Sequence, residues 1–203
     1  MRKIATLYGG HAPHFRTFHE PKINQYLEKI IYLPHFRETD LVDMDILIVP
    51  SQLHLELLLD AAPAIHRFAE LGGIVVAFGP QPIDWIPNQN WELRPTNFWW
   101  WLEDGADSGL RLVAPEYPLF RDSFLDIAKC TWHQHGVFHL SEGMESLIDM
   151  KDGGSLLYVD KVSTNGTWIV TTLDPDFHFG SYFMPATEQF LMGFIPWLAS
   201  GEI

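Results

Sequence analysis

Short, unbroken runs of apolar residues mark the first half of the chain. Such runs occur within residues 3–8, 45–50 and 74–78, and more polar stretches separate them. A continuous apolar run of about four to eight residues is typical of a strand that is buried on both faces. With helices predicted between them, the runs alternate as strand, helix and strand. This alternation predicts an α/β protein with a parallel sheet and right-handed crossovers.

Three segments carry helical signals. After Pro21 the apolar residues recur at i, i+4, i+7 and i+8, which predicts a helix that ends at Leu33-Pro34. A second helix is expected to begin with Asp60 as its N-cap, to hold Pro63 in its first turn and to end at Gly72-Gly73. A third helix is predicted over residues 186–198. The buried face of the first helix would consist of Ile23, Leu27, Ile30 and Ile31.

The second half is richer in strand signals. Short apolar segments alternate with turn residues, and Thr164-Asn165-Gly166 in particular predicts a β-hairpin. Between residues 80 and 109 the pattern is lost, and prolines and tryptophans dominate. We expect this Trp-rich insertion to run over the carboxyl edge of the sheet. The strands of this half are predicted over residues 110–114, 128–132, 137–140, 145–150, 155–160 and 167–173.

Composition narrows the class of protein. The 203 residues are 47% hydrophobic and 19% charged and show no linker, so we expect a single domain, 1–203. A net charge of −13 repels polyphosphate, which excludes a general nucleic-acid partner. The apolar runs are too short for a membrane span, and residues 1–11 have no signal-peptide pattern. The single cysteine, Cys130, excludes an internal disulfide framework and suits a reducing cytoplasm.

A glycine turn follows the apolar run at 74–78 in the position of a nucleophile elbow. Enzymes that use such an elbow place Cys or Ser on the turn. Here the turn is Phe78-Gly79-Pro80-Gln81-Pro82 and offers no nucleophile. Ser51 also follows a predicted strand but lacks flanking glycines, and Cys130 is predicted to lie in a strand as a core residue.

Four loops are expected to meet at one edge of the sheet, because each follows a predicted strand. They cover residues 8–14, 51–52, 79–84 and 174–178. From these loops we select Tyr8, His11, Ser51 and Gln81 as ligand-binding candidates, with Trp85 or Trp99 as a stacking wall. For the Gly-Gly turn with His11 and His14, surface histidines on a flexible turn remain the alternative.

The remaining candidates are histidines and one carboxylate. His133 and His135 would share one face of a strand, and such a pair can bind a metal when Asp174 or His178 supplies a further ligand. No complete metal motif accompanies them, so we assign neither metal nor cofactor. His135, Asp174 and His178 are instead proposed for acid–base work, with His133 in ligand binding. Backbone hydrogen bonding by the imidazoles, or helix capping by Asp174 or Asp176, would also explain the pattern.

Two stretches carry a family resemblance. Residues 45–50 (DILIVP) followed by 68–76 (FAELGGIVV) resemble the class I glutamine amidotransferase-like superfamily. Residues 165–178 (NGTWIVTTLDPDFH), with the helix that ends at 196–198, are similar to trehalose-utilisation (ThuA-like) proteins and to the middle domain of some β-galactosidases. The resemblance implies a flavodoxin-like three-layer sandwich with a mainly parallel sheet, to which the β-hairpin and the Trp-rich insertion are added.

The resemblance also implies what activity to expect. True amidotransferases use an elbow cysteine with a later histidine and acid, but here the elbow falls at Phe78 or Gly79. We therefore expect an amidotransferase-like protein without glutaminase activity that binds a small polar ligand, a carbohydrate being one class. A metal- or His/Asp-dependent hydrolase is the first alternative. The second is a structural module in which the aromatic residues at 85–101 form a homo-oligomer interface.

Overall fold

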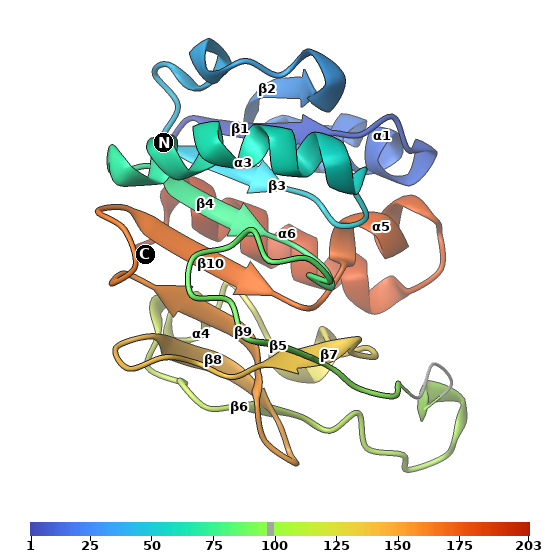
Figure 1. Ribbon diagram of the computed structural model, residues 1–203. Coiled ribbons are helices and arrows are strands. Elements are labelled where there is room, and N and C mark those ends of the chain that lie inside the picture. The colour runs from blue at the N-terminus through green and yellow to red at the C-terminus, as the bar shows by residue number, and fades with distance from the viewer. Residues whose placement is uncertain (97–99) are drawn as a thin grey trace.

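The computed structural model describes residues 1–96 and 100–203, and in this part of the chain ten strands form one mixed sheet. Its order is β2-β1-β3-β4-β10-β9-β7-β5, with β8 between β9 and β6 (Figure 1). The strands of one half run parallel: β1 (Ile4–Tyr8), β2 (Leu27–Tyr32), β3 (Ile46–Val49), β4 (Ile74–Ala77) and β10 (Thr167–Thr171). Those of the other half pair antiparallel: β5 (Trp91–Leu93), β6 (Leu110–Leu112), β7 (Gly136–Phe138), β8 (Glu145–Met150) and β9 (Ser155–Asp160).

Helices cover both faces of the parallel half (Figure 1). One face carries α3 (Leu55–Glu70), and the other carries α1 (Ala12–His19), α2 (Pro21–Asn24) and α6 (Pro185–Ser200), with α5 (Pro175–Gly180) after β10. The remaining helical turns are α4 (Pro118–Arg121), η1 (Leu33–His35), η2 (Glu38–Leu41), η3 (Trp100–Leu102) and η4 (Ile127–Lys129). Across the described residues, the helices are too short or too polar to cross a membrane.

Two hydrophobic cores explain the unbroken apolar runs. Within β3, Ile46 and Ile48 belong to the core under α6, whereas Leu47 and Val49 belong to the core under α3. Every residue of β3 is buried, which explains why all four of its positions are apolar. The strands predicted within 3–8, 45–50 and 74–78 are therefore confirmed.

The parallel half has the flavodoxin-like order 2-1-3-4-5, with β10 as the fifth strand. The predicted turn at 164–166 joins β9 and β10 as an antiparallel hairpin, which is confirmed. The predicted core of parallel strands is confirmed, but the antiparallel half is larger than the single hairpin that was expected. It contains β5 to β9, so the sheet as a whole is mixed.

The predicted helix at 21–33 is wrong. Helix α2 ends at Asn24, and β2 follows at the sheet edge, where Ile31 pairs with Leu7 of β1. The apolar residues of β2 serve opposite faces, since Ile30 packs on the core under α6 and Ile31 on the core under α3. The spacing of Ile23, Leu27, Ile30 and Ile31 looks helical only because the short helix α2 is followed directly by the short strand β2. The crossover from β1 to β2 consists of α1 and α2, and the sequence did not predict α1.

The structure differs from the sequence prediction at three further places. Helix α3 begins at Leu55, so Pro63 lies inside it, on the exposed side where water can solvate the carbonyl group that the ring leaves unpaired. The strand predicted at 128–132 is instead η4 followed by an irregular segment. The insertion at 80–109 was predicted to run over the carboxyl edge of the sheet. It contains β5 and η3, and its Trp85 and Ile86 pack into the core under α3.

Candidate functional site

A carboxylate and an imidazole lie together just after β10, the last parallel strand. Asp174 precedes α5, and Pro175 occupies the first helical position. The backbone N–H of His178 donates to the Asp174 carbonyl group, which forms one helical turn. This i,i+4 spacing brings His178 Nε2 to 3.3 Å from Asp174 Oδ1. The Asp174 side chain is only 1% exposed, whereas that of His178 is 12% exposed.

The segment 132–135 brings two more imidazoles to the same carboxylate. Trp132 anchors it: its indole ring packs edge-on against Phe190 of α6, and its N–H donates to Asp174 Oδ1 over 3.4 Å. His135 Nε2 then lies 3.3 Å from Asp174 Oδ2. The His133 ring is perpendicular to those of His135 and His178, at centroid distances of 4.8 and 5.0 Å.

We call His133, His135, Asp174 and His178 the His–Asp cluster. One potential ligand atom from each residue lies within 4.8 Å of the others. The expectation that His133 and His135 share a strand face is wrong, because the segment is irregular. They converge because Trp132 fixes the loop against α6, while α5 presents Asp174 and His178 opposite it. His139, which directly follows β7, lies outside the cluster and contacts Glu92 at 2.6 Å.

Burial and charge set the protonation of the cluster. Burial, together with the neighbouring His135 and His178, lowers the pKa of His133 to about 4, so its imidazole is neutral near pH 7 and one ring nitrogen carries a lone pair. Burial alone would raise the pKa of Asp174, but the adjacent imidazoles outweigh it and hold that pKa below its usual range. An ionised carboxylate beside neutral imidazole suits acid–base chemistry or metal ligation.

Ser51 takes part in a second buried group, not in the cluster. Its backbone N–H and its hydroxyl both donate to Asp176 Oδ2, at 2.8 and 3.0 Å. His14 Nε2 lies 3.1 Å from the same oxygen, and all three side chains are buried. This group ties the end of β3 to α1 and α5. Ser51 is therefore held by a carboxylate rather than by an imidazole base, which argues against a nucleophilic role.

The sequence missed His14 and Asp176 as interacting residues. Both stand in segments that it singled out, the loop at 8–14 and the loop at 174–178. Their pairing depends on α1, which was not predicted. The only signal in the sequence was that one residue is a histidine and the other a carboxylate.

The glycine turn at the end of β4 has no room for a nucleophile. Gly79 has φ +85°, and a Cβ added there would overlap the Ser51 side chain and lie 3.5 Å from the Asp174 Cβ. The irregular chain from Pro80 to Asn90 follows, so no helix N-terminus in this described segment faces the turn. Cys130 does not replace the missing thiol, because it is buried and burial, with the nearby Asp126, raises its pKa to about 11.

Of two further candidates, Tyr8 and His11, it is His11 that a chain of aromatic rings links to the cluster. Tyr8, at the end of β1, is half-buried against Phe15 and Tyr32. His11 stacks on His14 with a centroid distance of 5.3 Å. Burial and the neighbouring His14 lower the pKa of His11. From His14, ring contacts continue through Phe177 to His178.

Gln81 and Trp85 serve the core instead. The Gln81 amide donates to the Phe78 carbonyl group and accepts from the Trp85 indole at 2.6 Å. Trp85 is 4% exposed and packs edge-on against Trp168, so its indole faces the core rather than a ligand. The stacking wall predicted at Trp85 is corrected accordingly. Trp99 lies outside the described residues.

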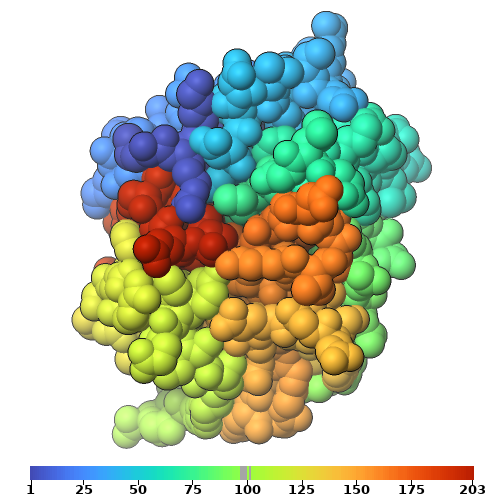
Figure 2. All heavy atoms as spheres, turned by 90° about the vertical axis from the view of Figure 1, so that its left-hand side faces the viewer, coloured from blue at the N-terminus to red at the C-terminus, as the bar shows by residue number. Residues whose placement is uncertain are grey.

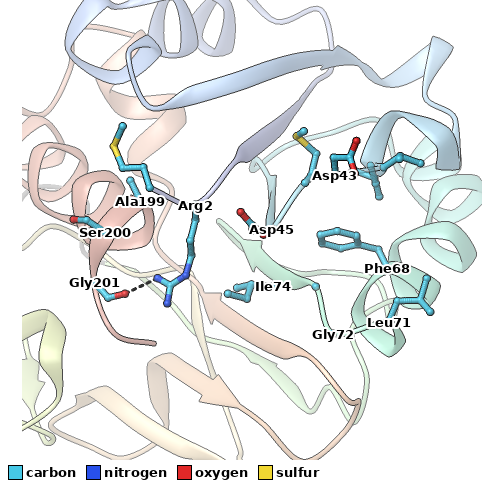
Figure 3. Close-up of a pocket in the computed structure, with 15 residues that line it drawn as sticks. Arg2, Asp43, Asp45, Phe68, Leu71, Gly72, Ile74, Ala199, Ser200 and Gly201 are labelled. Atoms are coloured by element: carbon cyan, nitrogen blue, oxygen red, sulfur yellow. Dashed lines mark hydrogen bonds between the residues drawn. The ribbon is translucent and has the colours of Figure 1, made fainter.

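Small hollows flank the cluster, and a larger one lies at the opposite edge. A pocket of about 190 Å³ adjoins His178 and Arg16, and one of about 250 Å³ adjoins His133 and Lys151. A cavity of about 830 Å³ lies where the parallel strands begin, at the edge seen in Figure 2. There Arg2 donates to the Gly201 carbonyl group (Figure 3). The described residues that line it include no histidine, and ligands of open α/β sheets bind at the other edge.

Comparison with protein-family models gives no match, and neither does comparison with curated proteins. Solved structures do match over nearly the whole chain. A cytoplasmic protein from Salmonella typhimurium LT2 has 11% identity and a TM-score of 0.58, with 98% of this chain and 100% of that one covered. A Thermoplasma acidophilum protein, named for one of the subunits of GMP synthase, has 10% identity and a TM-score of 0.57, with 98% and 96% covered.

The two other families named by the sequence resemblance also appear. A protein from Bacteroides uniformis named as ThuA-like has 11% identity and a TM-score of 0.53, with 95% of this chain and 89% of that one covered. A β-galactosidase from Bacillus circulans has 14% identity and a TM-score of 0.54, and the match covers 96% of this chain but 30% of the enzyme. Identities this low show the fold alone: the chain is built on the class I glutamine amidotransferase-like fold, as the resemblance predicted.

Proposed function

We propose that this protein binds a small polar ligand at the carboxyl edge of its parallel strands, carbohydrates being the first class to test, and that it has no glutaminase activity. The observation that carries the proposal is the His–Asp cluster at this edge. It joins one buried, ionised carboxylate to imidazoles, two of which reach the surface. In open α/β sheets this edge is where ligands bind.

The surroundings of the cluster favour a polar ligand with apolar faces. His135 is 22% exposed, so a ligand can reach it from solvent. On the α5 side, the Arg16 guanidinium lies 3.4 Å from the centre of the exposed Tyr182 ring, which places a cationic donor against an aromatic face. Aromatic faces beside hydrogen-bonding groups suit sugars. The ThuA-like and β-galactosidase names among the structural matches support the same class.

Glutamine hydrolysis through a thioester needs a reactive thiolate beside a base. Gly79 occupies the elbow, and its surroundings exclude a side chain. Cys130, the single cysteine, is buried and has its pKa raised to about 11. A buried thiol also suits the reducing cytoplasm, which we propose as the compartment.

Isothermal titration calorimetry against neutral sugars, amino sugars and sugar acids tests the proposal. We expect binding to at least one sugar class, weakened at least tenfold in His135→Ala and His178→Ala and unchanged in His139→Ala. His139 is a matched control because it is an exposed histidine outside the cluster. No heat change with any sugar, together with unaltered thermal unfolding, would contradict the proposal.

A His/Asp-dependent hydrolase is the second candidate, because His135 and His178 both contact Asp174. A carboxylate that orients an imidazole is the arrangement of general-base catalysis. Assays with esterase and glycosidase substrates test it, and turnover would have to fall in His135→Ala. Turnover that is absent, or that survives this change, removes the hydrolase.

A further inference from the structure

We infer that the His–Asp cluster is a binding site for one divalent transition-metal ion, zinc by its donor set, with His133, His135, Asp174 and His178 as ligands. The inference rests on the proposed function for its location, since both use the carboxyl edge of the parallel strands. It adds an ion that can be measured without any organic ligand.

The donors are of the right kind. Imidazole nitrogens and carboxylate oxygens are both ligands that zinc takes in proteins, usually four at a time. One ligand atom from each residue lies within 4.8 Å of the others, although the residues come from two segments 39 or more positions apart. Calcium and magnesium would require mainly oxygen donors, and the cluster offers one carboxylate.

The spacing also fits an ion better than direct hydrogen bonds. Asp174 Oδ1 lies 3.3 Å from His178 Nε2, and Asp174 Oδ2 lies 3.3 Å from His135 Nε2. Charge-assisted N–H···O bonds are about 2.7–2.9 Å long. Ligand atoms about 2.0–2.1 Å from a tetrahedral zinc ion are about 3.3 Å apart. Bringing two ligand atoms that are 4.8 Å apart to that spacing shortens their separation by about 1.5 Å, which the two side chains can share.

The supporting structure holds the ligands in place. Asp174 and His178 are fixed by one turn of α5, and Trp132 anchors the loop that carries the other two histidines. The Trp132 indole N–H also faces Asp174, as outer-shell groups do at metal sites. A cation placed here would neutralise a carboxylate that is 1% exposed. The exposed edges of His135 and His178 give the ion a path from solvent.

Four protein ligands close a tetrahedral shell, which is the arrangement of structural zinc sites. The ion would then join the loop at 132–135 to α5 and stabilise the fold by mass action. A closed shell leaves no position for water, so this site and His-dependent hydrolysis exclude one another.

The experiment uses the full chain, stripped with a chelator and titrated with Co²⁺ and then Zn²⁺. We expect one equivalent of zinc by elemental analysis, visible Co²⁺ absorption of tetrahedral intensity that zinc removes, and a higher Tm with zinc. His135→Ala and His178→Ala should each weaken zinc binding at least about 100-fold, beyond the 10–100-fold effect of losing an outer-shell partner. His139→Ala should bind like the unaltered protein.

Circular dichroism and thermal unfolding of each metal-free variant show that it folds, and His178→Gln serves if His178→Ala does not. Substoichiometric zinc, Co²⁺ absorption of octahedral intensity, or equal zinc affinity in the cluster variants and His139→Ala would overturn the inference. Sugar titrations of the metal-free protein separate the two proposals: sugar binding without zinc binding refutes only the metal site. Zinc binding without sugar binding refutes only the proposed function.

Discussion

His178 lies one helical turn after Asp174, and its Nε2 is 3.3 Å from the Asp174 carboxylate. This relationship fixes the orientation of both side chains at the end of β10, where the carboxyl ends of the parallel strands meet. The loop from Trp132 then adds His133 and His135 from the other side. The chain thus assembles a compact polar site beside an elbow position that carries no nucleophile.

Because Gly79 occupies the elbow position, the effect of introducing a cysteine there can be predicted. Gly79→Cys forces a side chain into a φ of +85° and against Ser51, so we expect the free energy of unfolding to fall by about 2–4 kcal/mol. Denaturant unfolding measures the loss, and an ammonia-release assay should detect no glutaminase. Gly72→Ala is the matched control, because its φ is +95° but nothing lies near the added Cβ. A stable Gly79→Cys protein that hydrolyses glutamine would contradict this account.

The Ser51–Asp176–His14 group is predicted to stabilise the fold rather than to react. Ser51→Ala removes a buried hydroxyl that donates to Asp176, which should lower the free energy of unfolding by about 1–3 kcal/mol. Asp176→Asn removes the carboxylate that accepts from Ser51 and contacts His14, so it should lower the free energy of unfolding by more than Ser51→Ala does. Zinc affinity and sugar binding should be unchanged in Ser51→Ala. If Ser51→Ala lost zinc affinity or sugar binding while its free energy of unfolding stayed unchanged, Ser51 would belong to the functional site.

Cys130 should be inert in the native protein. Burial raises the pKa of its thiol to about 11, so thiol reagents at pH 8 should label it only after unfolding. As pH rises from about 9 to about 11, the unfolded chain releases the thiol proton before the folded chain does. Stability should therefore fall over this range, and Cys130→Ala should remove part of the fall. Rapid stoichiometric labelling at pH 8 with no change in the fold would contradict the prediction.

Trp132 should act as a positioning residue for the cluster. Trp132→Phe keeps an aromatic ring against Phe190 but loses the N–H that faces Asp174. We expect zinc affinity to fall by about tenfold, within the range for outer-shell changes. Competition with a chromophoric chelator measures this affinity, and Trp168→Phe, a change of another buried tryptophan away from the cluster, is the control. Equal affinities in the two variants would show that the indole N–H has no part in the site.

The sequence predicted the parts of this structure that depend on local pattern. The strand at Ile46–Val49 could be predicted because burial on both faces forces every position to be apolar. The strand at Leu27–Tyr32 could not, because its identity depends on pairing with β1 rather than on its own spacing. Aromatic residues at 85–101 suggested an interface, yet Trp85 packs inside the chain's own core.

In the candidate site, too, the contacts set by local spacing could be predicted and the long-range contacts could not. Asp174 and His178 could be paired from their i,i+4 spacing, which a single helical turn fulfils. His133 and His135 were grouped with them for the wrong reason, since no strand holds the two. Their approach to Asp174 depends on where Trp132 inserts against α6, a long-range contact that spacing does not reveal. The same limit hid the His14–Asp176 pair, which joins residues from opposite ends of the chain.

The most direct test of the central claim is a crystal structure of the zinc-loaded protein with anomalous diffraction data at the zinc absorption edge. We expect one strong anomalous peak per chain, about 2.0–2.2 Å from nitrogen atoms of His133, His135 and His178 and from an Asp174 carboxylate oxygen. A peak elsewhere on the surface, or none while His135 and His178 contact Asp174 directly, would contradict the claim.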